Sequence, residues 1–184
     1  MIIGITGTIG SGKGTVVNYL KQLGFAHYSS SDILREILTE RGLPHVRLNM
    51  SNLANELMQS YSGGILEVAH ERAKQAHQPN YILESIHRVT EAEYIKSIGG
   101  VLLGVDADVR LRYARAIKRQ EGEKDMVTFE QFLADSERED EGKTGSGPNI
   151  KNVLKMADFV VNNDGTLEEL QRQLDNFIKD KLTL

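Results

Sequence analysis

The sequence predicts an α/β fold in which a five-stranded parallel sheet carries helices on both faces. Two observations support this prediction. Five short apolar stretches alternate with segments of helical periodicity, which is typical of a parallel sheet buried on both sides. A glycine-rich break follows the first stretch and separates it from the first helical segment. The 184 residues are enough for one sizeable core, so we expect a single domain over residues 1–184.

The expected strands are short and rich in apolar, often β-branched residues. Ile2, Ile3 and Ile5 mark the first of them. Pro79-Asn80 leads into the third, and the fourth has the sequence VLLGVD. The five predicted strands cover residues 1–6, 25–30, 81–85, 101–106 and 158–164.

The helices are predicted from apolar spacing and from capping residues. Val16, Leu20 and Leu23 repeat at helical spacing in the first helix. Three later helices are expected to begin with a capping box, in which a threonine precedes a glutamate or glutamine by three residues. The boxes are Thr90 with Glu93, Thr128 with Gln131, and Thr166 with Glu169. The helical ranges are 14–23, 31–42, 51–77 with a break at Gly63-Gly64, 91–98, 108–120, 129–139 and a final helix after Thr166.

Two segments are surplus to the alternation of strands and helices. Residues 31–78 lie between the second and third strands, and residues 120–149 follow an arginine-bearing helix. Insertions in such sheets usually lie at the carboxyl ends of strands, where ligands bind. We therefore expect both segments to border the functional site, with a core made of residues 1–30, 79–119 and 150–184.

Composition excludes several classes of protein. A formal net charge of −4 and a pI near 5.8 argue against a nucleic-acid partner, which usually requires a basic face. The chain has no cysteine, which excludes disulfides and thiolate zinc sites. No apolar stretch reaches membrane-spanning length, and the first residues lack the pattern of a signal peptide. We therefore expect a cytoplasmic protein without a membrane partner, either a monomer or a homodimer.

Residues 7–13 match the pattern G-x-x-x-x-G-K between a strand and a helix. Glycines let successive backbone N–H groups converge on one anion, and the start of the helix adds the positive end of its dipole. Lys13 adds a flexible positive charge for the terminal phosphates. The pattern strongly indicates a nucleoside triphosphate site. Its predicted ligands are Gly7, Thr8, Ile9, Gly10, Ser11, Gly12, Lys13, Gly14 and Thr15.

The stretch GTIGSGKGT resembles the loop of nucleoside monophosphate kinases of the adenylate kinase type, in which glycine and then threonine commonly follow the lysine. The similarity continues along nearly the whole chain, and ADFVVNNDGTLEEL is closer to dephospho-coenzyme A kinases. The resemblance implies a three-layer P-loop kinase fold with an acceptor-binding helical insert at 31–78 and a short lid at 120–149. It also implies ATP and Mg²⁺ as cofactors and small nucleotides as substrates.

The resemblance also implies roles for residues near the second and third strands. HYSSSDILRE is similar to the acceptor-site helix, so Arg35 would hold the acceptor phosphate with Ser30 nearby. YILESIHR is similar to a stretch that usually ends in D-G-x-P-R, so Glu84 would take the acidic role near magnesium and Arg88 would hold phosphate. The implied metal ligands are Thr15 and Glu84, the latter through water. The implied catalytic residues are Lys13, Asp32, Glu84, Arg88 and Arg115.

Further roles follow for the second half of the chain. VDADVRLRYARAIKR is similar to the strand and helix that lead into the lid, which makes Arg115 and Arg119 phosphate ligands for the nucleotide. Arg138 resembles the second lid arginine and is placed with the acceptor ligands. The turn after the last strand packs near the adenine in these families, and it contains Asn163, Asp164 and Gly165. Arg110 and Arg112 match no family position, and we interpret them as part of a solvated helix face.

Two departures from the family pattern bear on the acceptor. Glu84-Ser85 stands where the family usually has aspartate-glycine. Ser30-Ser31-Asp32 stands where dephospho-coenzyme A kinases typically have D-x-D, whose first aspartate would accept the proton of a hydroxyl group. With Arg35 and Arg88, this favours a nucleoside monophosphate, whose phosphate is already ionised at neutral pH. A dephospho-coenzyme A kinase or another hydroxyl kinase is the second hypothesis, and an ATP-dependent switch without acceptor phosphorylation is the third.

Overall fold

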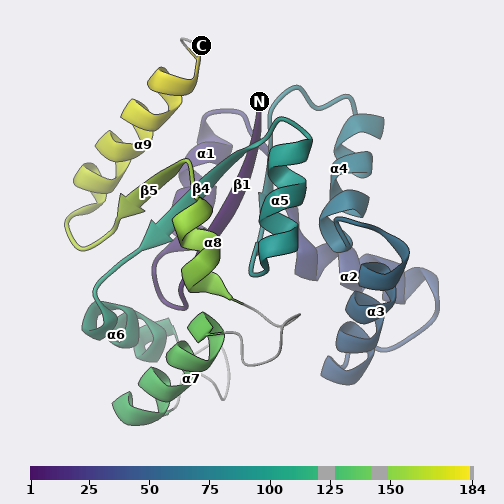
Figure 1. Ribbon diagram of the computed structural model, residues 1–184, viewed down its shortest axis with the longest axis horizontal. Coiled ribbons are helices and arrows are strands. Elements are labelled where there is room, and N and C mark those ends of the chain that lie inside the picture. The colour runs from purple at the N-terminus through teal and green to yellow at the C-terminus, as the bar shows by residue number, and fades with distance from the viewer. Residues whose placement is uncertain (120–126, 142–148, 183–184) are drawn as a thin grey trace.

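The computed structural model describes residues 1–119, 127–141 and 149–182, which form a three-layer α/β fold (Figure 1). The middle layer is a five-stranded sheet in the order β2-β3-β1-β4-β5, and all neighbouring strands are parallel. The predicted fold class is therefore confirmed. Since β1 lies at the centre, the loop that follows it lies in the middle of the C-terminal edge of the sheet. The strands are β1 Ile2–Gly7, β2 Ala26–Ser29, β3 Tyr81–Glu84, β4 Val101–Asp106 and β5 Phe159–Asn162.

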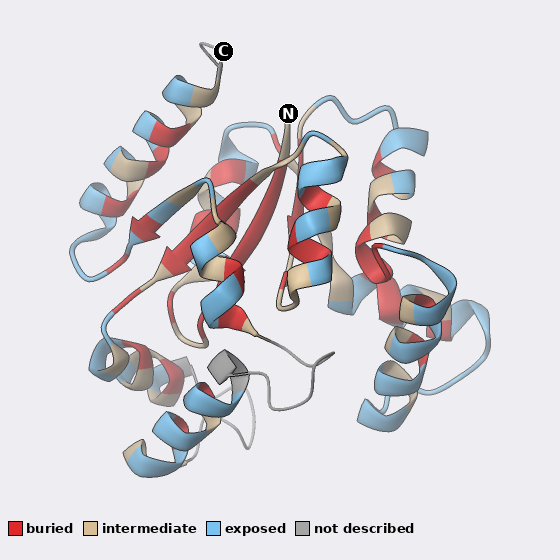
Figure 2. Cartoon of the chain, viewed as in Figure 1, coloured by how far each residue is buried: buried red, intermediate tan, exposed pale blue. Residues whose placement is uncertain are grey.

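Apolar side chains that alternate along the strands form a separate core on each face of the sheet. Ile3 and Ile5 pack with α1 and α9, whereas Leu83 and Leu102 pack with the helices of the opposite face. Figure 2 shows buried residues concentrated in the sheet and on the helix faces turned toward it. Full burial of such a side chain contributes about 1.5–3 kcal/mol, so the two cores fix the positions at which the strands end. The helices are α1 Lys13–Gln22, α2 Ser30–Glu40, α3 Arg47–Ser60, α4 Ile65–Gln75, α5 Val89–Ser97, α6 Val109–Arg119, α7 Phe129–Glu141, α8 Ile150–Met156 and α9 Leu167–Leu182.

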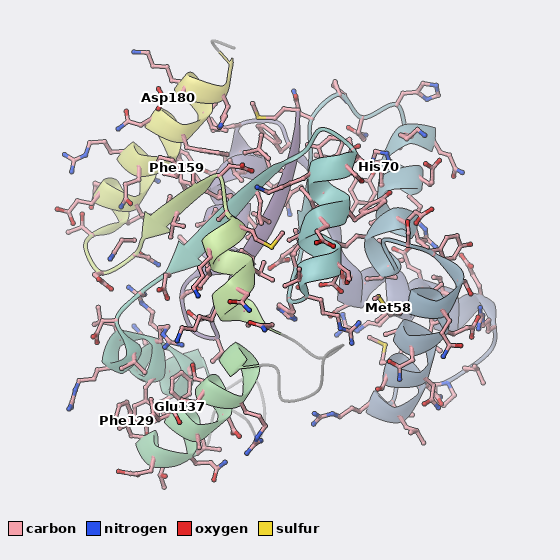
Figure 3. The ribbon with its side chains drawn as sticks, in the orientation of Figure 1. Met58, His70, Phe129, Glu137, Phe159 and Asp180 are labelled. Atoms are coloured by element: carbon pink, nitrogen blue, oxygen red, sulfur yellow. The ribbon has the colours of Figure 1, made fainter. Side chains whose placement is uncertain are left out.

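Helices α6 and α7 lie together beyond the C-terminal edge of the sheet, near the end of β4 (Figure 1). Aromatic rings join them: the ring of Tyr113 on α6 lies 5.3 Å from that of Phe129 and 5.5 Å from that of Phe132 on α7. Figure 3 labels Phe129 and Glu137 on this second helix. Helices α2 and α3 lie beyond the same edge on the side of β2 and β3. The described ends of the strands are therefore bordered on both sides by helices.

Most of the predicted elements are confirmed, including the break between two helices at Gly63-Gly64, which separates α3 from α4. The capping box at Thr166 and Glu169 is also confirmed, because each residue's side chain accepts a hydrogen bond from the other's backbone N–H. At Thr128, the hydroxyl oxygen accepts a hydrogen bond from the backbone N–H of Gln131. Apolar spacing and capping residues thus located these elements correctly.

Two predictions about local structure are wrong. The capping box of Thr90 and Glu93 does not form, because α5 already starts at Val89 and Glu91 caps it instead. Helix α8 was not predicted at all. Its cap is Asn149, whose side-chain oxygen accepts a hydrogen bond from the backbone N–H of Asn152 at 3.1 Å. In the part of the chain that the structure describes, no helix combines the length and the apolar character needed to cross a membrane.

Candidate active site

The phosphate loop, residues 7–13, connects β1 to α1 at the C-terminal edge of the sheet. Gly12 is the N-cap of α1 and has a left-handed φ of 97°. The backbone N–H of Ser11 donates to the carbonyl of Thr8 at 3.2 Å, which closes the loop into a compact turn. The start of a helix presents backbone N–H groups and the positive end of the helix dipole. The loop and the helix start therefore form an anion-binding geometry.

Three neighbouring segments hold the phosphate loop from outside. The Asn163 side chain, from the turn after β5, donates through Nδ2 to the carbonyl of Ser11 at 2.8 Å. The Thr8 hydroxyl donates to Asp106 at the end of β4 at 3.1 Å. Arg112 of α6 lies over the loop and donates to the carbonyl of Ile9 at 3.4 Å. These contacts define the shape of the loop without a ligand.

The loop fits so closely against these neighbours that two of its glycines have no room for a side chain. A Cβ at Gly12 would lie 2.2 Å from Nδ2 of Asn163. A Cβ at Gly10, where φ is 76°, would lie 2.4 Å from the carbonyl oxygen of Arg112. Gly10 and Gly12, both predicted as ligands, are thus also required by the packing of the loop.

A cavity of about 550 Å³, here called the loop cavity, opens above the phosphate loop. Lys13 borders it, and its Nζ donates to the carbonyls of Gly7 at 2.8 Å and Thr8 at 2.9 Å. Seven residues predicted for nucleotide or metal binding meet in this cavity. The described lining residues are Gly10, Gly12, Lys13, Gly14, Thr15, Glu84, Arg115 and Ala116.

Two buried donors, one on α6 and one in the phosphate loop, have no hydrogen-bond partner among the described residues. One is Nη1 of Arg115, whose other terminal nitrogen donates to the carbonyl of Asn163 at 2.8 Å. The second is the hydroxyl of Ser11, a residue with no exposed surface. A buried donor without an acceptor is unfavourable, so Arg115, which lines the loop cavity, favours a ligand that supplies oxygen atoms. A nucleotide phosphate chain is a ligand of this kind.

Glu84 stands at the end of β3 and borders the loop cavity. Its carboxylate lies 2.8 Å from Nε2 of His27 on β2. Its backbone carbonyl accepts a hydrogen bond from the Ser30 hydroxyl at 3.1 Å. The next residue, Ser85, has a φ of 75°, in the left-handed region that non-glycine residues rarely adopt. The glycine that is usual in the family at this point is therefore replaced by a strained serine.

The oxygen atoms that border the loop cavity suit a magnesium ion bound partly by water and phosphate better than a metal ion held entirely by protein side chains. Thr15 and Glu84 border the same cavity, and both supply oxygen atoms. Among the described residues, no cluster of three or more histidine and carboxylate side chains could hold a metal ion. Magnesium commonly keeps several waters and is bound by one or two protein oxygens together with phosphates. The residues therefore suit a metal ion that arrives with a nucleotide.

Arg88 follows β3 by four residues and lies in a turn that Glu91 holds. The Glu91 carboxylate accepts hydrogen bonds from the backbone N–H groups of His87 at 2.8 Å and Arg88 at 3.0 Å. The Arg88 guanidinium is 3.9 Å from the same carboxylate. Burial raises the pKa of Glu91, and the two backbone hydrogen bonds and the Arg88 charge oppose this rise. Glu91 therefore positions the turn that carries Arg88.

Other predicted residues lie apart from the loop cavity, on exposed helix faces. Arg35 pairs with Asp32 at 2.8 Å, and these side chains are 51% and 63% exposed. Arg138 pairs with Asp135 at 2.9 Å on α7, and its side chain is 66% exposed. The structure does not bring these three predicted residues together with Lys13. The side chain of Arg119, at the end of α6, lies outside the described residues.

The turn after β5 contains Asn163, Asp164 and Gly165, which were predicted to lie near the adenine. Asn163 is buried and directed at the loop backbone, so its side chain supports the loop. Asp164 and Gly165 are exposed. The Asp164 carboxylate accepts a hydrogen bond from the backbone N–H of Asp108, which lowers the pKa of Asp164. The turn is thus held both to the phosphate loop and to the start of α6.

Three groups of site residues were missed by sequence reasoning. Arg112 is 7% exposed and donates to Ser136 and Ala107 as well as to the loop, so its interpretation as a solvated residue is wrong. No sequence pattern indicates a role for His27, because its contact with Glu84 depends on β2 lying beside β3 in the sheet. Lys151 and Lys155 were missed together with α8. They border a second cavity of about 510 Å³ whose other described lining residues are Thr8, Asp106, Ala107, Arg112, Glu137 and Leu154.

Comparisons with known proteins agree with this architecture. A family model described as an AAA domain matches residues 6–131. A UPF0200 protein of Sulfurisphaera tokodaii is 31% identical over 180 residues, which are 97% of this chain and 96% of that protein. The crystal structure of TT1252 from Thermus thermophilus has a TM-score of 0.62 at 23% identity, and covers 98% of this chain and 97% of its own. Dephospho-CoA kinase from Campylobacter jejuni has a TM-score of 0.56 at 18% identity, with 97% and 96% covered.

Proposed function

Because this chain belongs to the AAA-domain family of P-loop proteins and to the UPF0200 proteins, we propose that it is an ATP-dependent phosphotransferase. Its acceptor in this proposal is a small nucleotide, foremost a nucleoside monophosphate. The observation that carries the proposal is the loop cavity, which opens above the phosphate loop and is bordered by Lys13, Arg115 and Glu84. The fold shared with a dephospho-CoA kinase supports the same class of reaction.

In the proposed reaction, an oxygen of the acceptor phosphate forms a bond to the γ-phosphorus of ATP. The bond from this phosphorus to the β,γ-bridging oxygen breaks, and ADP leaves with the electron pair. The catalytic requirement is alignment of the two anionic fragments and stabilisation of the charge on the transferring group. The loop N–H groups, Lys13 and Arg115 supply that stabilisation. Magnesium, when bound, would neutralise charge on the β- and γ-phosphates near Thr15 and Glu84.

The proposed acceptor site lies on the β2 and β3 side of the loop cavity. Arg88 is the first acceptor ligand in this proposal, because it lies in the turn between β3 and α5 and Glu91 fixes that turn. In this proposal Asp32 and Arg35 belong to an acceptor-binding insert over residues 31–78, and Ser30, directly before the insert, lies near the acceptor phosphate. The proposal also keeps residues 120–149 as a lid that would exclude water from the transferring phosphate, with Arg119 before it and Arg138 within it; residues 120–126 and 142–148 of this range lie outside the described residues.

A second candidate function, transfer to a hydroxyl group, is favoured by Glu84. A hydroxyl acceptor keeps its proton at neutral pH, so a carboxylate beside the attacking oxygen would assist the reaction. Among the described residues, the Glu84 carboxylate has His27 as its side-chain hydrogen-bond partner, and it borders the loop cavity. Dephospho-coenzyme A is the acceptor to test first, because the fold resembles a kinase of that substrate.

A ligand panel followed by a turnover assay tests these proposals. Thermal shifts of the pure protein are measured with Mg²⁺ and ATP, each nucleoside monophosphate, and dephospho-coenzyme A. ADP production is then followed with each stabilising compound as acceptor. We expect ATP to stabilise the protein and one monophosphate to stimulate ADP production. Stimulation by dephospho-coenzyme A alone would establish the second candidate, whereas ATP binding without stimulation by any acceptor would contradict both.

A further inference from the structure

His27 and Glu84 are placed beside each other by the pairing of β2 with β3. In this parallel ladder His27 is opposite Ile82, and Ser29 is opposite Glu84. Side chains two residues apart along a strand lie on the same face, so His27 and Glu84 are diagonal neighbours on one face of the sheet. Ile82 packs into the core shared with α1, which identifies this face as the one that carries the phosphate helix.

The contact between the two side chains is short and partly screened from water. Nε2 of His27 and Oε2 of Glu84 are 2.8 Å apart, and the side chains are only 20% and 19% exposed. An ionised carboxylate can only accept hydrogen bonds, so Nε2 of the histidine is the donor. The second carboxylate oxygen, Oε1, has no hydrogen-bond partner among the described residues. One oxygen is therefore occupied, and the other is available to the loop cavity.

A glutamate in this position needs such support more than an aspartate would. Its side chain has one more rotatable bond than that of aspartate, and ordering a glutamate costs up to about 2 kcal/mol of rotamer entropy. A carboxylate that takes part in metal or proton chemistry must be held in a narrow range of positions. The hydrogen bond from His27 restricts Glu84 in this way, from a strand whose own position is fixed by the sheet.

We propose that His27 is a positioning residue for the magnesium-bound nucleotide: it holds Oε2 of Glu84 and thereby directs the other oxygen to the water shell of the metal. The inference rests on the proposed function, because it assumes that Glu84 serves a metal ion that arrives with ATP. It explains how this chain uses glutamate where an aspartate is usual in the resembled family. The histidine takes no part in bond making or breaking.

Calorimetric titration of ATP, once with Mg²⁺ and once with EDTA, tests the proposal without relying on turnover. The dissociation constant of ATP in EDTA, divided by that in Mg²⁺, measures how strongly the metal favours nucleotide binding. We expect His27→Phe to reduce this ratio about tenfold, the size seen when partners of metal ligands are removed. His27→Gln places an amide N–H near Nε2 and should stay within about threefold of the wild type. In a Glu84→Ala background, His27→Phe should have no further effect.

His77→Phe is the matched control. This histidine is exposed and lies before β3, at the edge of the sheet opposite the loop cavity, so its replacement should leave the ratio unchanged. Circular dichroism and melting temperature verify that each variant is folded. An unchanged ratio in folded His27→Phe would overturn the proposal, as would an equal loss in His27→Gln and His27→Phe. Wild-type protein that binds no ATP would overturn the proposed function itself, and the inference with it.

Discussion

The two sides of the candidate active site are built differently. On the nucleotide side, three hydrogen bonds hold the phosphate loop to its neighbours. Thr8 of the loop bonds to the end of β4, and the loop carbonyls accept from Asn163 after β5 and from Arg112 of α6. On the proposed acceptor side, the ion-pair partner of Arg35 among the described residues is Asp32, one turn earlier on the same helix, and both side chains are more than half exposed. Exposed ion pairs of this kind contribute about 0–1 kcal/mol, so they exchange readily for a ligand. The loop on the nucleotide side is therefore preformed, whereas Arg35 on the proposed acceptor side is held by a single exposed ion pair.

The largest effect is expected from Lys13→Ala, which tests whether the preformed side works as proposed. Loss of the ammonium group should lower the rate of phosphoryl transfer by about 10²–10³-fold, because one preorganised positive group is removed from the transition state. The melting temperature without nucleotide should change by only a few degrees. Lys21→Ala, on the exposed end of α1, is the control and should keep full activity. Full activity in the Lys13 variant would contradict the role of the loop cavity.

Arginine substitutions sharpen the contrast between the two sides. Arg112→Ala should destabilise the protein by about 2–4 kcal/mol, because it removes a buried guanidinium that bonds to Ala107, Ile9 and Ser136. Arg35→Ala should change stability by no more than about 0.5 kcal/mol. Urea denaturation of both variants measures the difference. Equal losses of stability would show that the acceptor side is as firmly built as the loop.

A pair of glycine substitutions tests how closely the loop is packed. Gly10→Ala should cost about 1–3 kcal/mol or more, because the new Cβ meets the backbone of Arg112 and φ is positive. Gly14→Ala should leave the stability of the protein unchanged or raise it by up to about 1 kcal/mol. A Cβ at this position would have no heavy atom within 4 Å, and alanine favours a helix more than glycine does. Thermal unfolding without ligand compares the two. A neutral Gly10 variant would mean that the loop can move away from α6.

The smallest effect concerns the turn that carries Arg88, which connects the two sides. Because burial raises the pKa of Glu91, the folded chain binds this proton more tightly than the unfolded chain. The corresponding stabilisation is complete below the pKa of the unfolded carboxyl and is lost as pH rises through the raised value. Glu91→Gln does not titrate, so its stability relative to the wild type should rise between pH 4 and pH 7. A constant difference in urea denaturation would contradict this assignment.

The nucleotide side was predictable because its signal is local. Residues 7–13 are contiguous, and their spacing with a strand before and a helix after indicates the loop directly. Support of the loop by Arg112 was not predictable, because periodicity gives the face of a helix but does not show that α7 will cover it. The pairing of His27 with Glu84 required the strand order. For α8, a capping signal was present at Asn149, but a seven-residue helix after a glycine- and serine-bearing stretch gives little periodicity.

The bond from Asn163 to Ser11 links residues 152 positions apart in the chain. During synthesis, the segment that becomes the phosphate loop leaves the ribosome early, but this partner follows only after β5 has been made. A nascent chain that stops before β5 therefore lacks one of the supports that set the shape of its nucleotide site. The order of synthesis thus delays completion of that site until all five strands of the sheet have been made.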